Sequence, residues 1–127
     1  MSHQFTREQR LLTSADFQRV FDNPLKSADS FFTVLAKKRL EGTDSRLGLA
    51  IAKKQLKRAV DRNRIKRLIR ETFRQEPSLE AQPIDFIVMT RHSVRAKTNA
   101  ELQQSLQQLF ARRFLNLIKH DTGRRVA

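Results

Sequence analysis

The chain has 127 residues, nine Phe, no Cys and a formal net charge of +13. Its length fits one domain, and a hydrophobic content of 39% can fill one modest core, which argues against a disordered basic tail. Without Cys there is no disulfide scaffold or thiolate metal site, and because neither a secretory signal nor a membrane-length apolar window is found, we expect a cytoplasmic protein without a membrane partner.

The N-terminal part of the chain predicts one short helix. Ser14 is a suitable N-cap, and we expect the helix over residues 15–21. Phe17 and Phe21 are four residues apart and therefore share one face. That spacing suits a core-packing face as well as a binding surface, so the pattern leaves both alternatives open.

Two strands are expected next. Residues 30–39 and 46–53 are rich in strand-forming types around a turn with Gly42, and they predict an antiparallel hairpin. In the second strand every other residue is large and apolar, whereas the residues between them, such as Gly48 and Ala50, are very small. The small face would leave a shallow trough that another chain could enter.

A basic helix, expected over residues 57–75, carries most of the excess charge. The stretch from Lys53 to Arg74 holds ten Lys or Arg against Asp61 and Glu71. At 100° per residue, an apolar stripe and a polar stripe fall on opposite faces. The apolar stripe consists of Ile65, Leu68, Ile69 and Thr72, and the polar stripe of Asn63, Arg67, Arg70 and Arg74. This concentration of positive charge indicates a polyanionic partner, and a phosphate backbone is the natural candidate.

The C-terminal part predicts a buried strand and an amphipathic helix. Residues 84–91 are nearly all apolar, as expected for a central strand covered on both faces. Thr98 and Glu101 form a T-x-x-E capping box that opens the helix. The apolar stripe of that helix consists of Leu102, Leu106, Leu109, Phe110, Phe114 and Leu117. We expect a single domain over residues 1–120, followed by a polar, mobile tail over 121–127.

The order helix-strand-strand-helix-strand-helix predicts an α+β fold. We expect a two-layer α/β sandwich in which the helices cover one face of a mixed sheet. A crossover could join the strands before and after the basic helix. The general rule for such crossovers favours a right hand.

The segment AVDRNRIKRLIRETFR, residues 59–74, resembles the signature of the bacterial ribonuclease P protein component. In that family an Arg-Asn-Arg core, here Arg62 to Arg64, precedes Ile-Lys-Arg and Arg-Glu-x-Phe. Four further segments match the family in order and spacing: RLLTSADFQRVF, RLGLAIAKK, IDFIVMTR and LxxxLxxLF. Together they span about residues 7–118, and the similarity points to the proteobacterial branch.

The resemblance implies a fold and a function. The fold would be ribosomal-type, like ribosomal protein S5 domain 2, with a left-handed βαβ crossover that departs from the general rule. The function would be that of the protein subunit of ribonuclease P, the endoribonuclease EC 3.1.26.5. In that enzyme the catalytic RNA, which holds most of the Mg²⁺, removes the 5′ leader from precursor tRNA. The resemblance implies no catalytic residue, no metal ligand and no required protein partner for the chain itself.

The resemblance also implies site residues. The motif maps RNA contacts onto Arg62, Asn63, Arg64, Lys66, Arg67 and Arg70, and helical periodicity extends this cationic band to Arg58 and Arg74. Leader contacts are implied for Phe17, Phe21, Lys53 and Lys54, and either Phe31 or Phe32 would add a further ring. Aromatic faces beside cations suit single-stranded RNA of any sequence, because every base has a π-face and every nucleotide has a phosphate. The chain departs from its relatives at Thr33 and Leu35, where they use an aromatic residue in the middle of the first strand.

Two other functions remain as alternatives. One is a structural RNA-binding protein of the ribosomal type, and the other is a nuclease that acts alone. Nothing in the sequence brings His3, His92 and His120 together, which argues against a histidine-based nuclease. The acidic residues show no metal-ligand spacing, and Asp85 is expected to be a capping or edge group.

Overall fold

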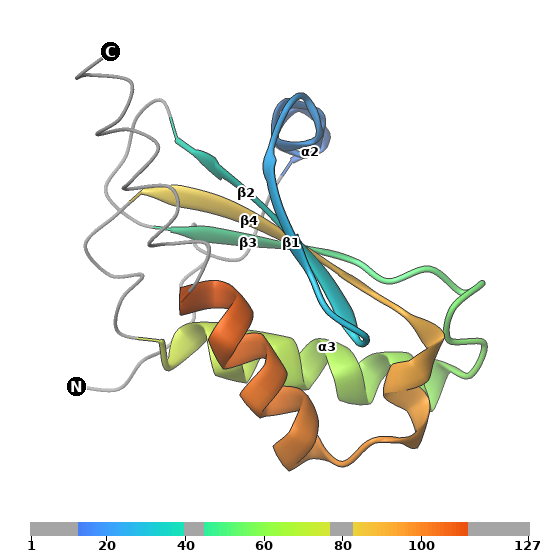
Figure 1. Ribbon diagram of the computed structural model, residues 1–127. Coiled ribbons are helices and arrows are strands. Elements are labelled where there is room, and N and C mark those ends of the chain that lie inside the picture. Colours follow the sequence, from blue (N-terminus) through green and yellow to red (C-terminus); the bar gives the residue numbers. More distant parts are fainter. Residues whose placement is uncertain (1–12, 40–44, 77–82, 112–127) are drawn as a thin grey trace.

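The computed structural model describes residues 13–39, 45–76 and 83–111 of the chain. In these ranges a mixed four-stranded sheet has α3 and a final helix on one face and α2 on the other (Figure 1). The elements are α2 (Ser14–Phe21), β1 (Leu25–Ala28), β2 (Phe32–Lys38), β3 (Arg46–Ala50), α3 (Ala59–Arg74), β4 (Ile84–Thr90) and the short 3₁₀ helix η2 (His92–Ala96). The final helix is described over residues 99–111. The α+β class with a mixed sheet is confirmed.

The strand order is β1-β2-β4-β3, so β4 is central. β4 runs antiparallel to β2, with Val88 opposite Val34, and parallel to β3, with Val88 opposite Leu49. The predicted hairpin between 30–39 and 46–53 is therefore wrong, because β4 lies between these strands. The hairpin partner of β2 is β1, a four-residue strand too short to give a clear alternating pattern. α3 joins the parallel neighbours β3 and β4, and the hand of this crossover stays a prediction.

The main core lies between the sheet and the two longer helices. Phe73 of α3, Phe86 of β4 and Phe110 of the final helix meet edge to face, with ring centroids 5.4 to 6.0 Å apart. Each such pair contributes about 0.5–1.5 kcal/mol beyond the burial of its area. The fully buried Ile65 and Ile69 hold α3 in this core, as its apolar stripe predicted. The opposite face of α3 is thereby turned outward.

The final helix begins at the predicted capping box. The Thr98 N–H donates to Glu101 Oε2 at 3.0 Å, and the Glu101 N–H donates to Thr98 Oγ1 at 3.2 Å. The buried side of the helix consists of Leu102, Leu106, Leu109 and Phe110. Phe114, Leu117 and the tail over 121–127 lie outside the described residues, so the expected domain limits stay predictions.

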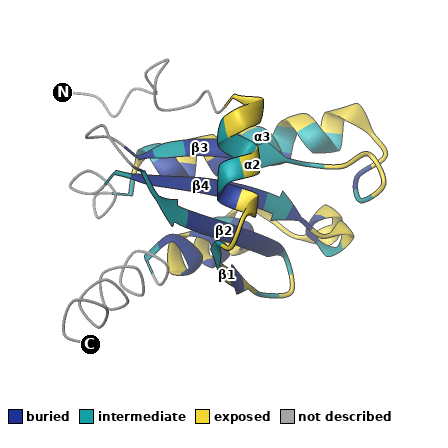
Figure 2. Cartoon of the chain, turned by 90° about the horizontal axis from the view of Figure 1, so that it is seen from above, coloured by how far each residue is buried: buried dark blue, intermediate teal, exposed yellow. Residues whose placement is uncertain are grey.

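A second, smaller core lies on the other face of the sheet. There Val20 of α2 packs on Leu35 and Ile87. Figure 2 shows α2 crossing above the buried central strand β4. The expectation that the helices cover one face holds for α3 and the final helix and is wrong for α2. The physical reason is that β4 is apolar on both sides, with Phe86 facing one way and Ile87 the other, so each face needs a cover.

A buried carboxylate fastens α2 to the sheet. Asp85 of β4 is fully buried and accepts hydrogen bonds from Nε and Nη2 of Arg46, both at 2.8 Å, and from the guanidinium of Arg19 in α2. Arg46 also pairs with Asp16 of α2, with 3.2 Å between Nη2 and Oδ1. The pKa of Arg46 is raised, first by its hydrogen bond to Asp85. The expectation of a capping or edge role for Asp85 is wrong, because a charge in the centre of a sheet must be paired.

At both ends of α2, backbone groups also form hydrogen bonds with side chains. The Thr13 hydroxyl accepts the Asp16 N–H at 3.2 Å, and Asp16 Oδ2 accepts the Thr13 N–H at 3.0 Å, so the N-cap is Thr13 and not Ser14. At the C-terminal end, Lys37 Nζ donates to the carbonyl of Arg19 at 3.1 Å, where a cation complements the helix dipole. These contacts give α2, and the side chains that it carries, a defined place on the sheet.

Candidate nucleic-acid interface

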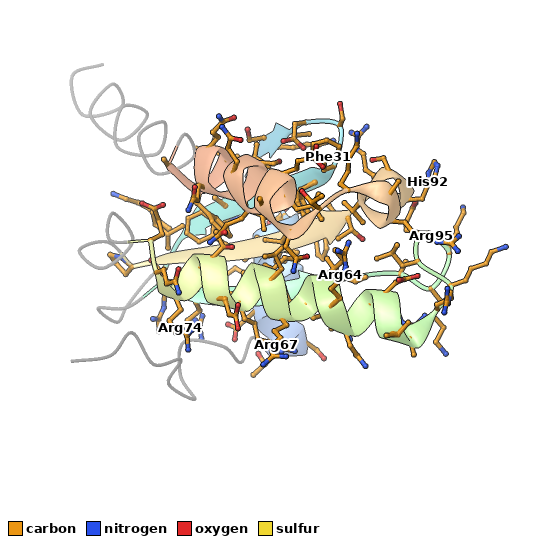
Figure 3. The ribbon with its side chains drawn as sticks, turned by 90° about the horizontal axis from the view of Figure 1, so that it is seen from below. Phe31, Arg64, Arg67, Arg74, His92 and Arg95 are labelled. Atoms are coloured by element: carbon orange, nitrogen blue, oxygen red, sulfur yellow. The ribbon has the colours of Figure 1, made fainter. Side chains whose placement is uncertain are left out.

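The outward face of α3 is polar and mostly cationic. Of the residues expected to contact RNA, Arg58, Asn63, Arg67 and Arg70 are exposed, and Arg62, Arg64, Lys66 and Arg74 are half-buried. Figure 3 shows Arg64, Arg67 and Arg74 spread along the length of α3. The two acidic side chains of the helix are Asp61, in the first turn, and Glu71. We use the term outer face of α3 for Asn63, Arg67, Arg70 and Arg74.

One ion pair lies on this face. Arg67 Nε is 3.5 Å from Glu71 Oε1, one turn along the helix, and the two side chains are 80% and 48% exposed. An exposed pair of this kind contributes little, typically about 0.3–0.5 kcal/mol. Breaking this ion pair therefore costs little free energy.

Arg62 and Arg64 have a different setting from Arg67 and Arg70. Arg62 Nη1 donates to the carbonyls of Leu56 at 2.8 Å and Lys57 at 2.9 Å. These bonds connect α3 to the segment that precedes it. Arg64 donates across to the final helix, to Asn99 Oδ1 at 2.9 Å, and to the Lys97 carbonyl at 3.2 Å. Both arginines of the Arg-Asn-Arg core thus stabilise the fold around α3, whereas Asn63 between them points outward.

The two phenylalanines of α2 form a second candidate surface, the α2 aromatic patch. The rings of Phe17 and Phe21 lie 6.3 Å apart at an interplanar angle of 28°. Phe17 is half-buried against the smaller core, whereas Phe21 is 47% exposed. Phe17 therefore packs partly into the smaller core, whereas Phe21 lies at the surface.

The remaining leader residues divide between two places. Lys53 and Lys54 are exposed in the turn after β3, and Ala50 at the end of that strand packs against the core that holds Phe17. Phe31 packs instead against the main core on the α3 side of the sheet, where Lys97 Nζ lies 5.7 Å from its ring centroid. Phe32 is fully buried. Ile51 and Leu56, on either side of the two lysines, belong to the main core, so a place for Lys53 and Lys54 beside the α2 aromatic patch stays a prediction, and Phe31 lies on the other side of the sheet from that patch.

A further cationic segment was missed by the sequence analysis. Arg91, His92, Arg95 and Lys97 are exposed in and around η2. Figure 3 shows His92 and Arg95 projecting near one end of α3, and Arg95 Nε lies 3.8 Å from Asp61 Oδ2. The segment RHSVRAK is itself basic, but it follows a strand, and only the fold places it beside the basic helix.

Two other kinds of feature were searched for in the part of the chain that the structure describes. Over those residues, no His, Asp or Glu side chains gather in groups of three or more that could hold a metal ion. Within the same ranges no helix has the length and apolar character needed to cross a membrane.

Comparison with known proteins identifies the family. The family profile for Ribonuclease P matches residues 5–113. The chain belongs to the ribonuclease P protein family. The "Ribonuclease P protein component" of Thioalkalivibrio sulfidiphilus is 45% identical over 108 residues, which cover 85% of this chain and 88% of that protein. The protein of the same name from Pseudoalteromonas translucida is 42% identical over 106 residues, 84% of this chain and 74% of that protein.

Solved structures of ribonuclease P proteins share the fold. The Staphylococcus aureus protein superposes with a TM-score of 0.73 at 34% identity, covering 83% of this chain and 96% of that one. The Thermotoga maritima protein gives a TM-score of 0.71 at 27% identity, covering 82% and 96%. The predicted membership of the bacterial ribonuclease P protein family and its proteobacterial character are thereby confirmed. Family membership places the chain among the proteins of ribonuclease P, a ribonucleoprotein of tRNA processing.

Proposed function

We propose that the chain is the protein subunit of ribonuclease P and that it holds two RNA segments on two separate surfaces. The outer face of α3 binds the catalytic RNA, and the α2 aromatic patch with Lys53 and Lys54 binds the single-stranded 5′ leader of precursor tRNA. The observation that carries the proposal is the exposure of Asn63, Arg67 and Arg70 on a helix anchored by its other side. Guanidinium groups suit this role because their planar fork meets phosphate oxygens with two hydrogen bonds.

The α2 aromatic patch suits a single strand. An exposed ring such as that of Phe21 offers a face on which a base can stack whatever its sequence, and Lys53 and Lys54 supply charge for the backbone. Exposure of a large ring to water is otherwise unfavourable, so an occupant that covers it gains apolar burial. Phe31 lies on the α3 side and is left out of this surface, although the sequence suggested it for the leader.

In this proposal the RNA subunit, and not the protein, catalyses cleavage. The catalytic RNA and the Mg²⁺ that it holds cleave the leader, while the protein orients the substrate and neutralises phosphate charge. The chain would supply no catalytic group and no resident metal. A location in the cytoplasm belongs to the same proposal.

Phe21→Ala in the reconstituted holoenzyme tests the leader surface. We expect it to weaken binding of leader-bearing precursor tRNA about 5- to 150-fold, because stacking on one ring contributes about 1–3 kcal/mol per base. Binding of mature tRNA, which has no leader, should stay the same. Gln107→Ala is the control, since Gln107 is exposed on the final helix and belongs to neither proposed RNA surface. Equal losses for precursor and mature tRNA, or no loss for either, would overturn the leader assignment.

A further inference from the structure

A hollow of about 380 Å³ lies on the flank of α3 next to the start of the final helix. Its lining consists of Val60, Asn63, Arg64, Arg67, Leu68 and Glu71 of α3 and Asn99 of the final helix. We call it the α3 groove. This volume is at the small end of the range for pockets that hold small organic molecules, so it suits one nucleotide and not a helix.

The α3 groove is partly apolar. Val60 is 61% exposed, although it stands in a helix that is otherwise cationic on its outward side. Leu68 continues the apolar surface into the main core. An exposed β-branched residue has low helix propensity and gains nothing from water, and a phosphate would not contact it favourably. The position instead favours a ligand with an apolar face.

The polar groups of the groove are arranged for a planar partner. The guanidinium of Arg64 is fixed by its hydrogen bonds to Asn99 Oδ1 and the Lys97 carbonyl, so part of its donor capacity is already used within the protein. Its flat face remains suited to stacking. The Asn63 amide is exposed and presents one donor and one acceptor side by side. An amide of this kind matches the N6–H and N7 edge of adenine.

We propose that the α3 groove receives one unpaired base of the catalytic RNA, with adenine favoured. The base lies on Val60 and Leu68 against the guanidinium plane of Arg64, and its edge bonds to Asn63. The inference rests on the proposed function, because it names a contact made within the same α3 interface. It separates that interface into a base-binding groove at Asn63 and phosphate contacts at Arg70.

Asn63→Ala and Arg70→Ala distinguish the two kinds of contact. Both residues are exposed on α3, but Arg70 does not line the groove. The measurements are the affinity of the protein for the catalytic RNA over a range of salt concentrations and the reactivity of adenine N7 toward diethyl pyrocarbonate in the complex. The wild type should protect one unpaired adenine. Asn63→Ala should expose it again, lower affinity about tenfold and leave the salt slope unchanged, because a base contact releases no counterion.

Arg70→Ala should do the reverse, with the protected adenine retained at saturating protein and the salt slope reduced by about 0.7–0.9. An abasic nucleotide at the protected position should weaken the wild type and leave Asn63→Ala no weaker than before. If Asn63→Ala lowers the salt slope and no adenine responds, the groove contacts phosphate and the inference is overturned. If the wild type fails to bind the catalytic RNA at all, the proposed function falls and the inference falls with it.

Discussion

Asp85 joins α2 to the sheet, and Asp85→Asn tests whether this buried carboxylate determines the place of α2. The carboxylate receives two hydrogen bonds of 2.8 Å from Arg46 and one from Arg19, and it has no exposure to water. An Asn side chain has nearly the same shape, but its amide carries no charge and has one acceptor oxygen in place of two. The guanidinium groups of Arg46, Arg19 and Arg39 would then lose the negative charge of Asp85.

The magnitude follows from the burial of the partners. Removing one member of a fully buried ion pair costs about 3–5 kcal/mol. Arg46 and Arg19 are 18% and 25% exposed, so water can reach part of the freed charge. We therefore expect Asp85→Asn to lower the free energy of unfolding by about 2–3 kcal/mol, somewhat below the value for a fully buried pair.

Urea unfolding at neutral pH, followed by far-ultraviolet circular dichroism, measures this loss. Glu71→Gln is the control, because it removes an equally charged but exposed partner and should cost no more than about 0.5 kcal/mol. Since α2 carries Phe17 and Phe21, Asp85→Asn should also weaken leader binding more than catalytic-RNA binding. A loss of stability no larger than that of Glu71→Gln would refute the idea that Asp85 anchors α2.

Two further predictions concern charged residues other than Asp85. Burial acts to raise the pKa of Asp16, but the hydrogen bonds from Thr13 and the charge of Arg46 outweigh it, so the pKa lies below the model-peptide value of 3.8. A lowered folded-state pKa gives stability that is present above the unfolded pKa and lost as pH falls through the folded one. The free energy of unfolding of the wild type should therefore be higher than that of Asp16→Asn at pH 6, and the difference should shrink below about pH 3.8. A constant difference over this pH range would contradict the lowered pKa of Asp16. Arg64→Ala should lower the free energy of unfolding by about 1–2 kcal/mol through its lost bonds to Asn99 and the Lys97 carbonyl, whereas Arg70→Ala should stay within about 0.5 kcal/mol. Equal thermal unfolding of these two variants would mean that Arg64 does not support the fold.

Local patterns in the sequence were sufficient for several elements. The basic helix was expected over residues 57–75 and is found over Ala59–Arg74, with the expected side buried. The apolar run near residue 84 correctly predicted a central strand, and Thr98 with Glu101 correctly predicted a helix start. In each case the signal depends on residues within a few positions of one another.

Pairing between distant segments could not be predicted in the same way. β2 and β3 are neighbours in the chain, yet β4 enters between them, and nothing local in either strand reports this. The side of the sheet that α2 covers is equally non-local, and it determines the surroundings of two rings: Phe21 is exposed on α2, whereas Phe31 packs on the main core. Charge patterns likewise could not show that Arg62 and Arg64 donate to backbone carbonyls, whereas Arg70 is exposed.

The most direct test of the central claim is cleavage of precursor tRNA by reconstituted components at low Mg²⁺ concentration. The protein alone, the catalytic RNA alone and the two together should be compared on one leader-bearing substrate. We predict no cleavage by the protein alone, slow cleavage by the RNA, and faster cleavage at the same bond by the complex. Cleavage by the protein without RNA would contradict the account. An unchanged rate in a complex that has formed would also contradict it and would favour a purely structural RNA-binding protein.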